Sequence, residues 1–131
     1  MLQLFACMRD LAEYVIVDCV SDPADLMSAM AKSEADTIIQ MISPDLKCMT
    51  YYASNAEQYA AISDRTVKVM NKKENDIFLP NEEVSAHFKN VQFVLPYSQA
   101  LKRQTYTGTL SERLSDSKYR AAISKTAKAV I

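Results

Sequence analysis

An aspartate stands directly after an apolar, β-favouring run near the start of the chain. The run covers residues 14–17, and Asp18 follows it. A carboxylate at the end of a rigid, buried strand can face the Mg²⁺ of a bound nucleotide, usually through a water molecule. A buried strand also ends in aspartate where that residue serves as a cap or a turn residue. Asp18 is therefore a candidate Mg²⁺ site whose pattern is weak by itself.

Two later positions suit a nucleotide base. Asn71 follows the run at residues 66–70, and its carboxamide places a donor beside an acceptor, which matches the amino group and ring nitrogen of adenine. Pro96 and Tyr97 follow the run at residues 91–95. A proline there stops the ladder and gives a flat apolar wall beside a base. A turn-forming asparagine and a strand-ending loop are the structural alternatives.

The elements that must position these residues alternate between strand-like and helical patterns, which predicts an α/β fold. Expected strands cover residues 14–17, 36–42, 66–70 and 91–95. Expected helices cover residues 1–12, 46–62 and 117–130, with two more starting at Asp22-Pro23 and at residue 81. Continuous apolar runs indicate strands that are covered on both faces. We expect one domain over residues 1–131: a three-layer, mainly parallel sheet flanked by helices, with the candidate residues at the carboxyl ends of its strands.

Composition limits the function classes. Fifteen basic and sixteen acidic residues give a net charge of −1, so there is no overall basic footprint for nucleic acid or anionic lipid. No apolar run reaches the roughly 18 residues of a membrane span, and the first ten residues do not resemble a secretion signal. The three cysteines share no metal-ligand spacing, and His87 is expected to be an ordinary surface residue.

Glycine is the most informative residue type, because the chain has only Gly108. A loop that wraps a phosphate needs several glycines, since its backbone approaches the anion closely and takes positive φ angles. One glycine cannot supply either of the common phosphate-binding loops. We therefore expect that this chain does not hold a triphosphate in the usual way by itself.

Four collinear blocks resemble the ParA/MinD family of deviant-Walker ATPases, and are most similar to its CpaE/TadZ-like branch. The blocks are Tyr-Val-Ile-Val-Asp-Cys, Ala-Asp-Thr-Ile-Ile-Gln-Met-Ile-Ser-Pro-Asp, Val-Lys-Val-Met-Asn-Lys, and Leu-Pro-Tyr-Ser-Gln-Ala followed by Thr-Gly-Thr-Leu. Together they span residues 14–110, nearly the whole chain. No single block is specific, and the argument depends on their shared order and spacing.

The resemblance implies roles for the candidate residues. Asp18 would be the Walker B aspartate near Mg²⁺ and the attacking water, Asn71 would read adenine, and Pro96 with Tyr97 would flank the base. Members use ATP and Mg²⁺, dimerise around ATP, and position pilus, flagellar or partition machinery. The intact protein would be cytoplasmic and act at a pole, membrane or nucleoid. Val20 departs from the pattern, because many members have proline there.

The largest departure is the missing glycine-rich loop with its two lysines. Without it we expect no catalysis by this chain alone, because phosphoryl transfer depends on positioning and charge stabilisation. The first hypothesis is the carboxy-terminal half of such an ATPase, with the missing amino-terminal half or a homodimer mate as its partner. The alternative is a non-catalytic α/β domain for protein interaction or dimerisation. A receiver-like signalling domain is disfavoured, because the strand-end lysine that it requires is not evident.

Overall fold

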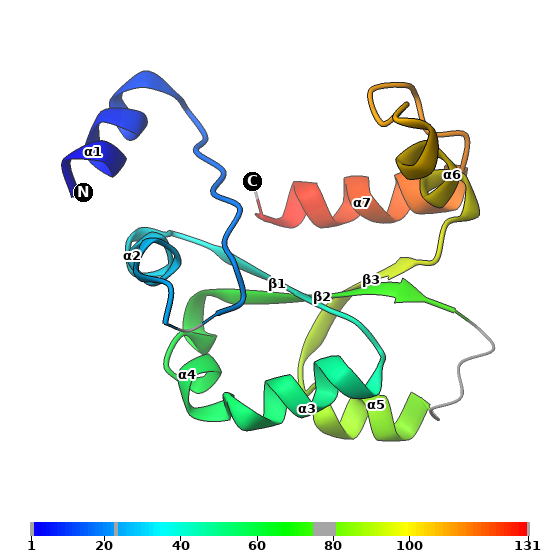
Figure 1. Ribbon diagram of the computed structural model, residues 1–131, viewed down its shortest axis with the longest axis horizontal. Coiled ribbons are helices and arrows are strands. Elements are labelled where there is room, and N and C mark those ends of the chain that lie inside the picture. The colour runs from blue at the N-terminus through cyan, green and yellow to red at the C-terminus, as the bar shows by residue number, and fades with distance from the viewer. Residues whose placement is uncertain (1, 23, 75–80, 131) are drawn as a thin grey trace. The chain divides into compact units, whose positions relative to one another are not determined.

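The computed structural model describes residues 2–22, 24–74 and 81–130 (Figure 1). The chain forms two compact units, residues 1–38 and 39–131, and each is described by itself. The first unit contains the helices α1 (Leu2–Leu11) and α2 (Leu26–Glu34). The remaining elements are β1 (Ile38–Ile42), α3 (Leu46–Ser54), α4 (Ala56–Ala60), a short 3₁₀ helix (Ser63–Arg65), β2 (Thr66–Lys73), α5 (Asn81–His87), β3 (Val91–Pro96), α6 (Gln99–Thr107) and α7 (Ser117–Val130). The single domain over residues 1–131 stays a prediction.

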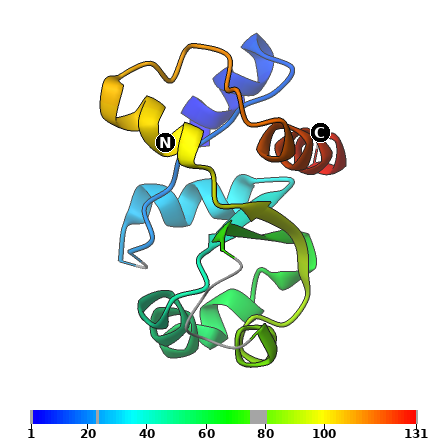
Figure 2. The same ribbon diagram turned by 90° about the vertical axis from the view of Figure 1, so that its right-hand side faces the viewer.

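A parallel sheet organises the second unit. In the part of the chain that the structure describes, its three strands are all parallel and follow the order β1-β2-β3. The helices α6 and α7 lie over one face of the sheet, and α3 and α5 lie over the other (Figures 1 and 2). The predicted fold class, an α/β protein with a parallel sheet flanked by helices, is therefore confirmed.

Each face of the sheet has its own hydrophobic core, because neighbouring residues of a strand point to opposite faces. Val69 packs with Leu95 and Tyr119 on the α7 side, whereas the next residue, Met70, packs toward α3 and α5. The buried residues of the core under α3 and α5 are Ile42, Met49, Met70, Val84 and Phe88. The alternation explains why the apolar run of β2 has no polar face.

Two irregularities interrupt the pairing of β2 with β3. Lys68 pairs with Val91 and Val69 pairs with Phe93, so β3 contains one extra residue there. Gln92 is that extra residue, and its Oε1 accepts a hydrogen bond of 2.7 Å from the main-chain N–H of Lys68. Toward the carboxyl end a second irregularity places the extra residue on β2. Bulges of this kind bend a strand and re-aim its side chains.

The first unit differs from the prediction at the start of its second helix. This helix begins at Leu26, and the Asp25 carboxylate caps it by accepting a 2.7 Å hydrogen bond from the Ser28 N–H. Asp22, the predicted cap, instead accepts from the Ala24 N–H at 2.9 Å, which is a local turn. Pro23, the predicted first helical residue, lies outside the described residues.

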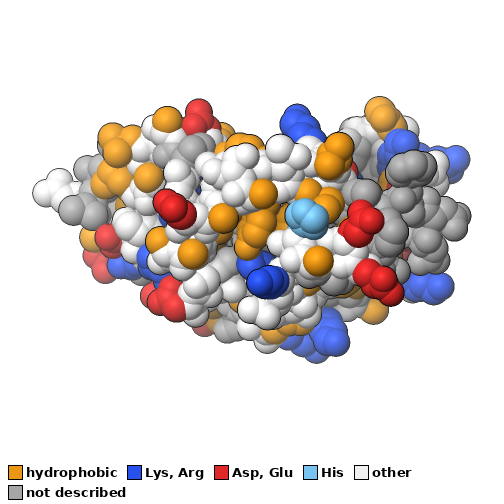
Figure 3. Space-filling model, turned by 90° about the horizontal axis from the view of Figure 1, so that it is seen from below, with side chains coloured by type: hydrophobic (Ala, Val, Ile, Leu, Met, Phe, Trp, Pro, Cys, Tyr) orange, Lys and Arg blue, Asp and Glu red, His pale blue; other side chains and the backbone are white. Residues whose placement is uncertain are grey.

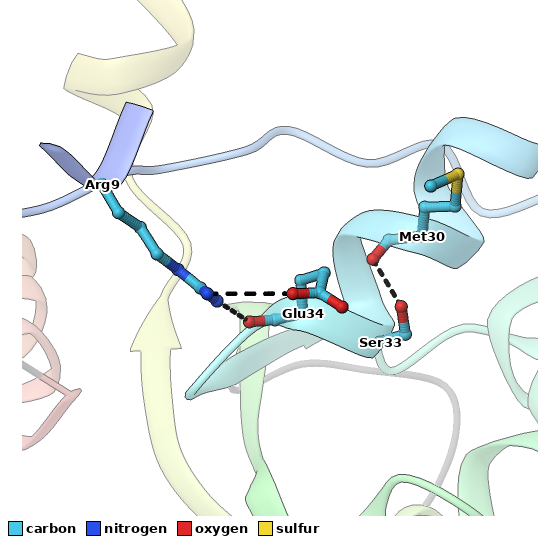
Figure 4. Close-up of polar contacts among 4 residues, drawn as sticks. All are labelled: Arg9, Met30, Ser33 and Glu34. Atoms are coloured by element: carbon cyan, nitrogen blue, oxygen red, sulfur yellow. Dashed lines mark hydrogen bonds and ion pairs between the residues drawn. The ribbon is translucent and has the colours of Figure 1, made fainter. Parts of the chain in front are cut away.

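Polar contacts connect α1 with the end of α2 (Figure 4). The Arg9 guanidinium donates to the main-chain carbonyl of Glu34, and one of its nitrogens lies 3.7 Å from the carboxylate of the same residue. Ser33 donates to the Met30 carbonyl at 2.8 Å, one turn earlier in the helix. A cation at a helix carboxyl end interacts favourably with the carbonyls that have no partner within the helix.

The predicted strand at residues 14–17 is wrong, because these residues form neither strand nor helix. They are exposed, and the side chain of Ile16 has a relative exposure of 90 %. A buried parallel strand needs a hydrogen-bonded neighbour and helices over its faces. The described residues provide no strand partner for this run. Its β-favouring composition therefore leaves it as a connecting segment between α1 and α2.

One predicted helix is divided in the structure, and one helix was not predicted. The predicted helix at residues 46–62 is divided into α3 and α4 at Asn55, whose side chain donates to the Tyr51 carbonyl at 2.8 Å. Helix α6 was not predicted. Ser98 caps it by accepting from the Leu101 N–H, and Gly108 ends it with a φ of 70°. These are a typical start and stop for a helix.

Candidate functional site

Two of the four predicted site residues, Pro96 and Tyr97, lie where β3 ends beside the carboxyl end of β2. Lys73 of β2 pairs with Pro96 of β3, and the main-chain N–H of Tyr97 donates to the Lys73 carbonyl at 2.9 Å. Asn71 was predicted to follow its strand, but it lies inside β2, because that strand continues for two more residues to Lys73. In parallel sheets, ligands bind at the carboxyl ends of the strands. This edge is therefore the candidate binding site.

The second irregularity lies in β2 between Met70 and Lys73, the stretch that contains Asn71. Met70 pairs with Val94 and Lys73 pairs with Pro96, so β2 contains one residue more than β3 over this stretch. Lys72 has a φ of 55°, which is left-handed and uncommon for a residue with a side chain. The bulge turns the backbone next to Asn71 away from regular pairing. Bulges are frequent next to functional sites because they aim a side chain.

Only the oxygen of the Asn71 carboxamide has a hydrogen-bond partner among the described residues. Its Oδ1 accepts a hydrogen bond of 2.9 Å from the Lys72 N–H. No described residue is recorded as a partner of its Nδ2 group. A carboxamide oxygen has two lone pairs, so Oδ1 retains capacity for one more donor. Asn71 can therefore offer a donor and an acceptor side by side from a half-buried position.

Tyr97 is held in place by two residues of α6. Its hydroxyl donates to Oε1 of Gln99 at 3.0 Å, and Nζ of Lys102 lies 6.0 Å from the ring centroid. The side-chain hydrogen bond to Tyr97 raises the pKa of Lys102. The tyrosine ring is half-buried, as is Pro96 beside it. An oriented ring next to a proline can form one wall of a base-binding slot.

Side chains cap the two helices that begin after β1 and β3. Asp45 follows β1, and its carboxylate accepts from the Cys48 N–H at 2.8 Å at the start of α3. Ser98 does the same for α6. Burial raises the pKa of the Cys48 thiol, whose sulfur accepts from the Ser43 N–H at 3.3 Å. These contacts fix the loops on either side of the candidate site.

Asp18, the fourth predicted residue, belongs to the first unit. It is exposed and directly follows the segment that was predicted as a strand. Its neighbour Val20 donates its main-chain N–H to the buried hydroxyl of Ser28 at 3.1 Å. The segment is thus attached to α2, and no strand carries the carboxylate. The proposed contact of Asp18 with Mg²⁺ stays a prediction.

The structure adds residues that the sequence pattern did not single out. Lys72 provides the positive φ of the bulge, and Gln99 and Lys102 orient the Tyr97 ring. The cap pattern from Ser98 to Gly108 would have identified the helix that carries the last two. Across residues 2–22, 24–74 and 81–130, no three His, Cys, Asp or Glu side chains gather as a metal site would require.

A hollow of about 540 Å³ lies on the face formed by α3 and α5. Hydrophobic side chains such as Leu46 and Met49 line it, together with Glu83 and His87. Figure 3 shows this face, with hydrophobic side chains around the histidine. Nδ1 of His87 lies 2.9 Å from the Glu83 carbonyl of its own helix, and the residue is exposed. The prediction of an ordinary surface histidine is consistent with this position.

Comparisons with family models, with curated proteins and with solved structures gave no match for this chain. Among the helices of the described ranges, none combines the length and the apolar character needed to cross a bilayer. The resemblance to ParA/MinD proteins therefore rests on the four sequence blocks alone.

Proposed function

We propose that the carboxyl ends of β2 and β3 bind the adenine base of a nucleotide. The chain would then be a fragment or a loop-less relative of a ParA/MinD-type nucleotide-switch ATPase that positions cellular machinery. The observation that supports this most strongly is that Asn71 stands in an irregular stretch of β2, where no described residue hydrogen-bonds to its Nδ2 group. Pro96 pairs with Lys73, two residues further along the same strand. Asparagine, proline and tyrosine are the residues that the resemblance assigns to the base.

The recognition would use both sides of the Asn71 carboxamide. Nδ2 donates to a ring nitrogen of adenine, and the remaining lone pair of Oδ1 accepts from its amino group. Pro96 and the Tyr97 ring provide apolar surface beside the base. In a complete site, Asp18 would face the Mg²⁺ that neutralises the phosphates. This chain alone is not proposed to hydrolyse ATP.

Replacing Asn71 by alanine is expected to weaken adenosine binding about tenfold, because two hydrogen bonds of ordinary strength are lost. Adenosine is the better first probe, since it tests the base site without the phosphates. NMR titration of the wild-type chain should give saturable shifts at Asn71 and Tyr97. The same titration with Mg²⁺ and ATP then shows whether phosphates add affinity.

Gln58→Ala is the matched control for Asn71→Ala, because it removes an exposed carboxamide from α4. It should leave adenosine binding unchanged. Guanosine should bind more weakly than adenosine, since its ring presents an oxygen where adenine has the amino group. An absence of shifts with adenosine, or equal binding by Asn71→Ala and wild type, would overturn the proposal.

A second candidate function, protein interaction, is favoured by the exposed run at residues 14–17. The relative exposures of Tyr14, Ile16 and Val17 are 55 %, 90 % and 46 %. Four consecutive exposed apolar residues with strong β propensity form a ready partner for another strand edge. We propose that this run pairs with a second copy of the chain, in keeping with a dimerisation domain.

Ile16→Lys is expected to weaken this self-association about tenfold, because a charge in the run disfavours strand pairing and burial. Sedimentation velocity over a range of protein concentrations measures it. Leu110→Lys is the control, because it adds the same charge at another exposed leucine, 58 % exposed and outside the run. A wild-type chain that stays monomeric, or equal weakening by both substitutions, would contradict the interaction proposal.

A further inference from the structure

A hollow of about 450 Å³ lies between α6 and the segment that follows it. Arg103 and Gln104 line it from the helix, and Glu112, Arg113 and Ser115 line it from the segment. All of these residues belong to the second unit. Ligand pockets are commonly of this size. Asn71, Pro96 and Tyr97 do not line this hollow, whereas Gln99, which accepts from the Tyr97 hydroxyl, does.

The chain folds back on α6 to build this hollow. Gly108 ends the helix in the left-handed conformation, and the N–H groups of Gly108 and Thr109 both donate to the Gln104 carbonyl. Glu112 then donates its N–H to the Thr109 carbonyl at 3.0 Å. The side chain of Gln104 holds this segment against the helix, because its Nε2 donates to the Glu112 carbonyl at 3.3 Å. Gln104 thus fixes the segment against the helix at one end.

The other end of the hollow is held where α7 begins. The Asp116 carboxylate accepts from the Tyr119 N–H at 3.0 Å, and Tyr119 is anchored in the core. Two hydrogen bonds lower the pKa of Asp116: the larger effect comes from the Tyr119 N–H, and the smaller from the Ser98 side chain. Ser98 is the cap of α6, so the starts of the two helices are connected through one carboxylate. The walls of the hollow are therefore cross-linked on both sides.

The hollow has a net positive charge from its lining side chains. Arg103 and Arg113 come from two different elements and line the same hollow. Within the described residues, no hydrogen bond or ion pair is recorded for either guanidinium group. Glu112 also lines the hollow, so the side chains carry a net charge of +1 from two arginines and one glutamate.

We propose that this hollow binds a phosphate group through Arg103 and Arg113. Guanidinium groups present donors in a planar fork, which matches the oxygens of phosphate and carboxylate. A phosphate group presents at least three oxygens to the donors of two guanidinium groups, whereas a carboxylate presents two. The amide of Gln99 and the hydroxyl of Ser115, which also line the hollow, add uncharged donors.

The test is an NMR titration of the isotope-labelled chain with orthophosphate at constant ionic strength. We expect saturable shifts in α6 and in residues 109–115. Arg103→Gln and Arg113→Gln should each weaken binding about tenfold, because each removes one charge-assisted contact. Arg103→Lys should be intermediate, since it retains the charge and loses the fork. Glycerol phosphate in place of orthophosphate shows whether an esterified phosphate also fits.

Lys125→Gln is the charge-matched control, because it removes one positive charge from an exposed position of α7. It should leave phosphate binding unchanged. Shifts that do not saturate, equal weakening by Lys125→Gln, or acetate binding as tightly as phosphate would overturn the proposal.

Discussion

Phe88→Ala is expected to destabilise the chain by about 3–5 kcal/mol, which is typical of removing a buried aromatic side chain. Phe88 has a relative exposure of 1 % and belongs to the core under α3 and α5. Its ring meets that of Tyr52 edge to face at 5.3 Å, so the substitution removes an aromatic pair as well as apolar burial. Small domains have a total stability of only about 5–15 kcal/mol.

Urea denaturation of the wild type and the variant measures this loss, with the midpoint falling and the slope unchanged. Tyr106→Ala is the control, since it removes an aromatic ring that is 80 % exposed. Its cost should stay within about 0.5 kcal/mol, as for most surface substitutions. Equal costs for the two variants would show that Phe88 is not a core residue.

The parallel sheet could be predicted because its strands carry their own signals. The runs at residues 36–42, 66–70 and 91–95 became β1, β2 and β3, with shifts of a few residues at their ends. Each run is mostly apolar, although helices cover the sheet incompletely: Ile39, Met41 and Val94 keep relative exposures of 48 %, 51 % and 48 %. The final helix, residues 117–130, was predicted with the boundaries that the structure has. Local composition and tertiary packing agree at these positions.

The run at residues 14–17 shows the limit of this reasoning. Its composition is as strand-like as that of β3, but a strand is a hydrogen-bonded pair and not a property of one segment. The described residues offer it no neighbouring edge, so it stays exposed. A sequence pattern shows which secondary structure a segment favours, but a strand forms only where the rest of the fold provides a neighbouring strand.

The candidate site could be predicted only in outline. Pro96 and Tyr97 were identified as residues at the end of a strand, and parallel pairing places them beside the carboxyl end of β2. Asn71 was predicted to follow its strand, but it lies within β2. The bulge that aims Asn71 depends on one extra residue in β2, and no local signal marks it. Helix α6, which orients Tyr97, had usable signals in Ser98 and Gly108. Hydrophobic periodicity alone missed it because the helix is largely polar.

Leu95→Ala is expected to destabilise the chain by about 2–5 kcal/mol, the range for truncating a buried leucine. Leu95 has a relative exposure of 3 % and packs with Val69 and Tyr119 on the face of the sheet under α7. This core is separate from the one that contains Phe88, so each substitution tests a different face. Loss of Leu95 packing would also loosen α7, because Tyr119 anchors that helix. Thermal and urea unfolding measure the effect.

Val94→Ala is the sharpest control for Leu95→Ala, because the two residues are adjacent in β3 and differ mainly in burial. Val94 is 48 % exposed, so its truncation should cost no more than about 1 kcal/mol. A shift of one residue in the pairing of β3 would exchange the two faces and reverse the order of the two costs. The same register pairs Pro96 with Lys73, whose carbonyl accepts from the Tyr97 N–H. A larger cost for Val94→Ala than for Leu95→Ala would therefore overturn both the core and the geometry of the proposed base site.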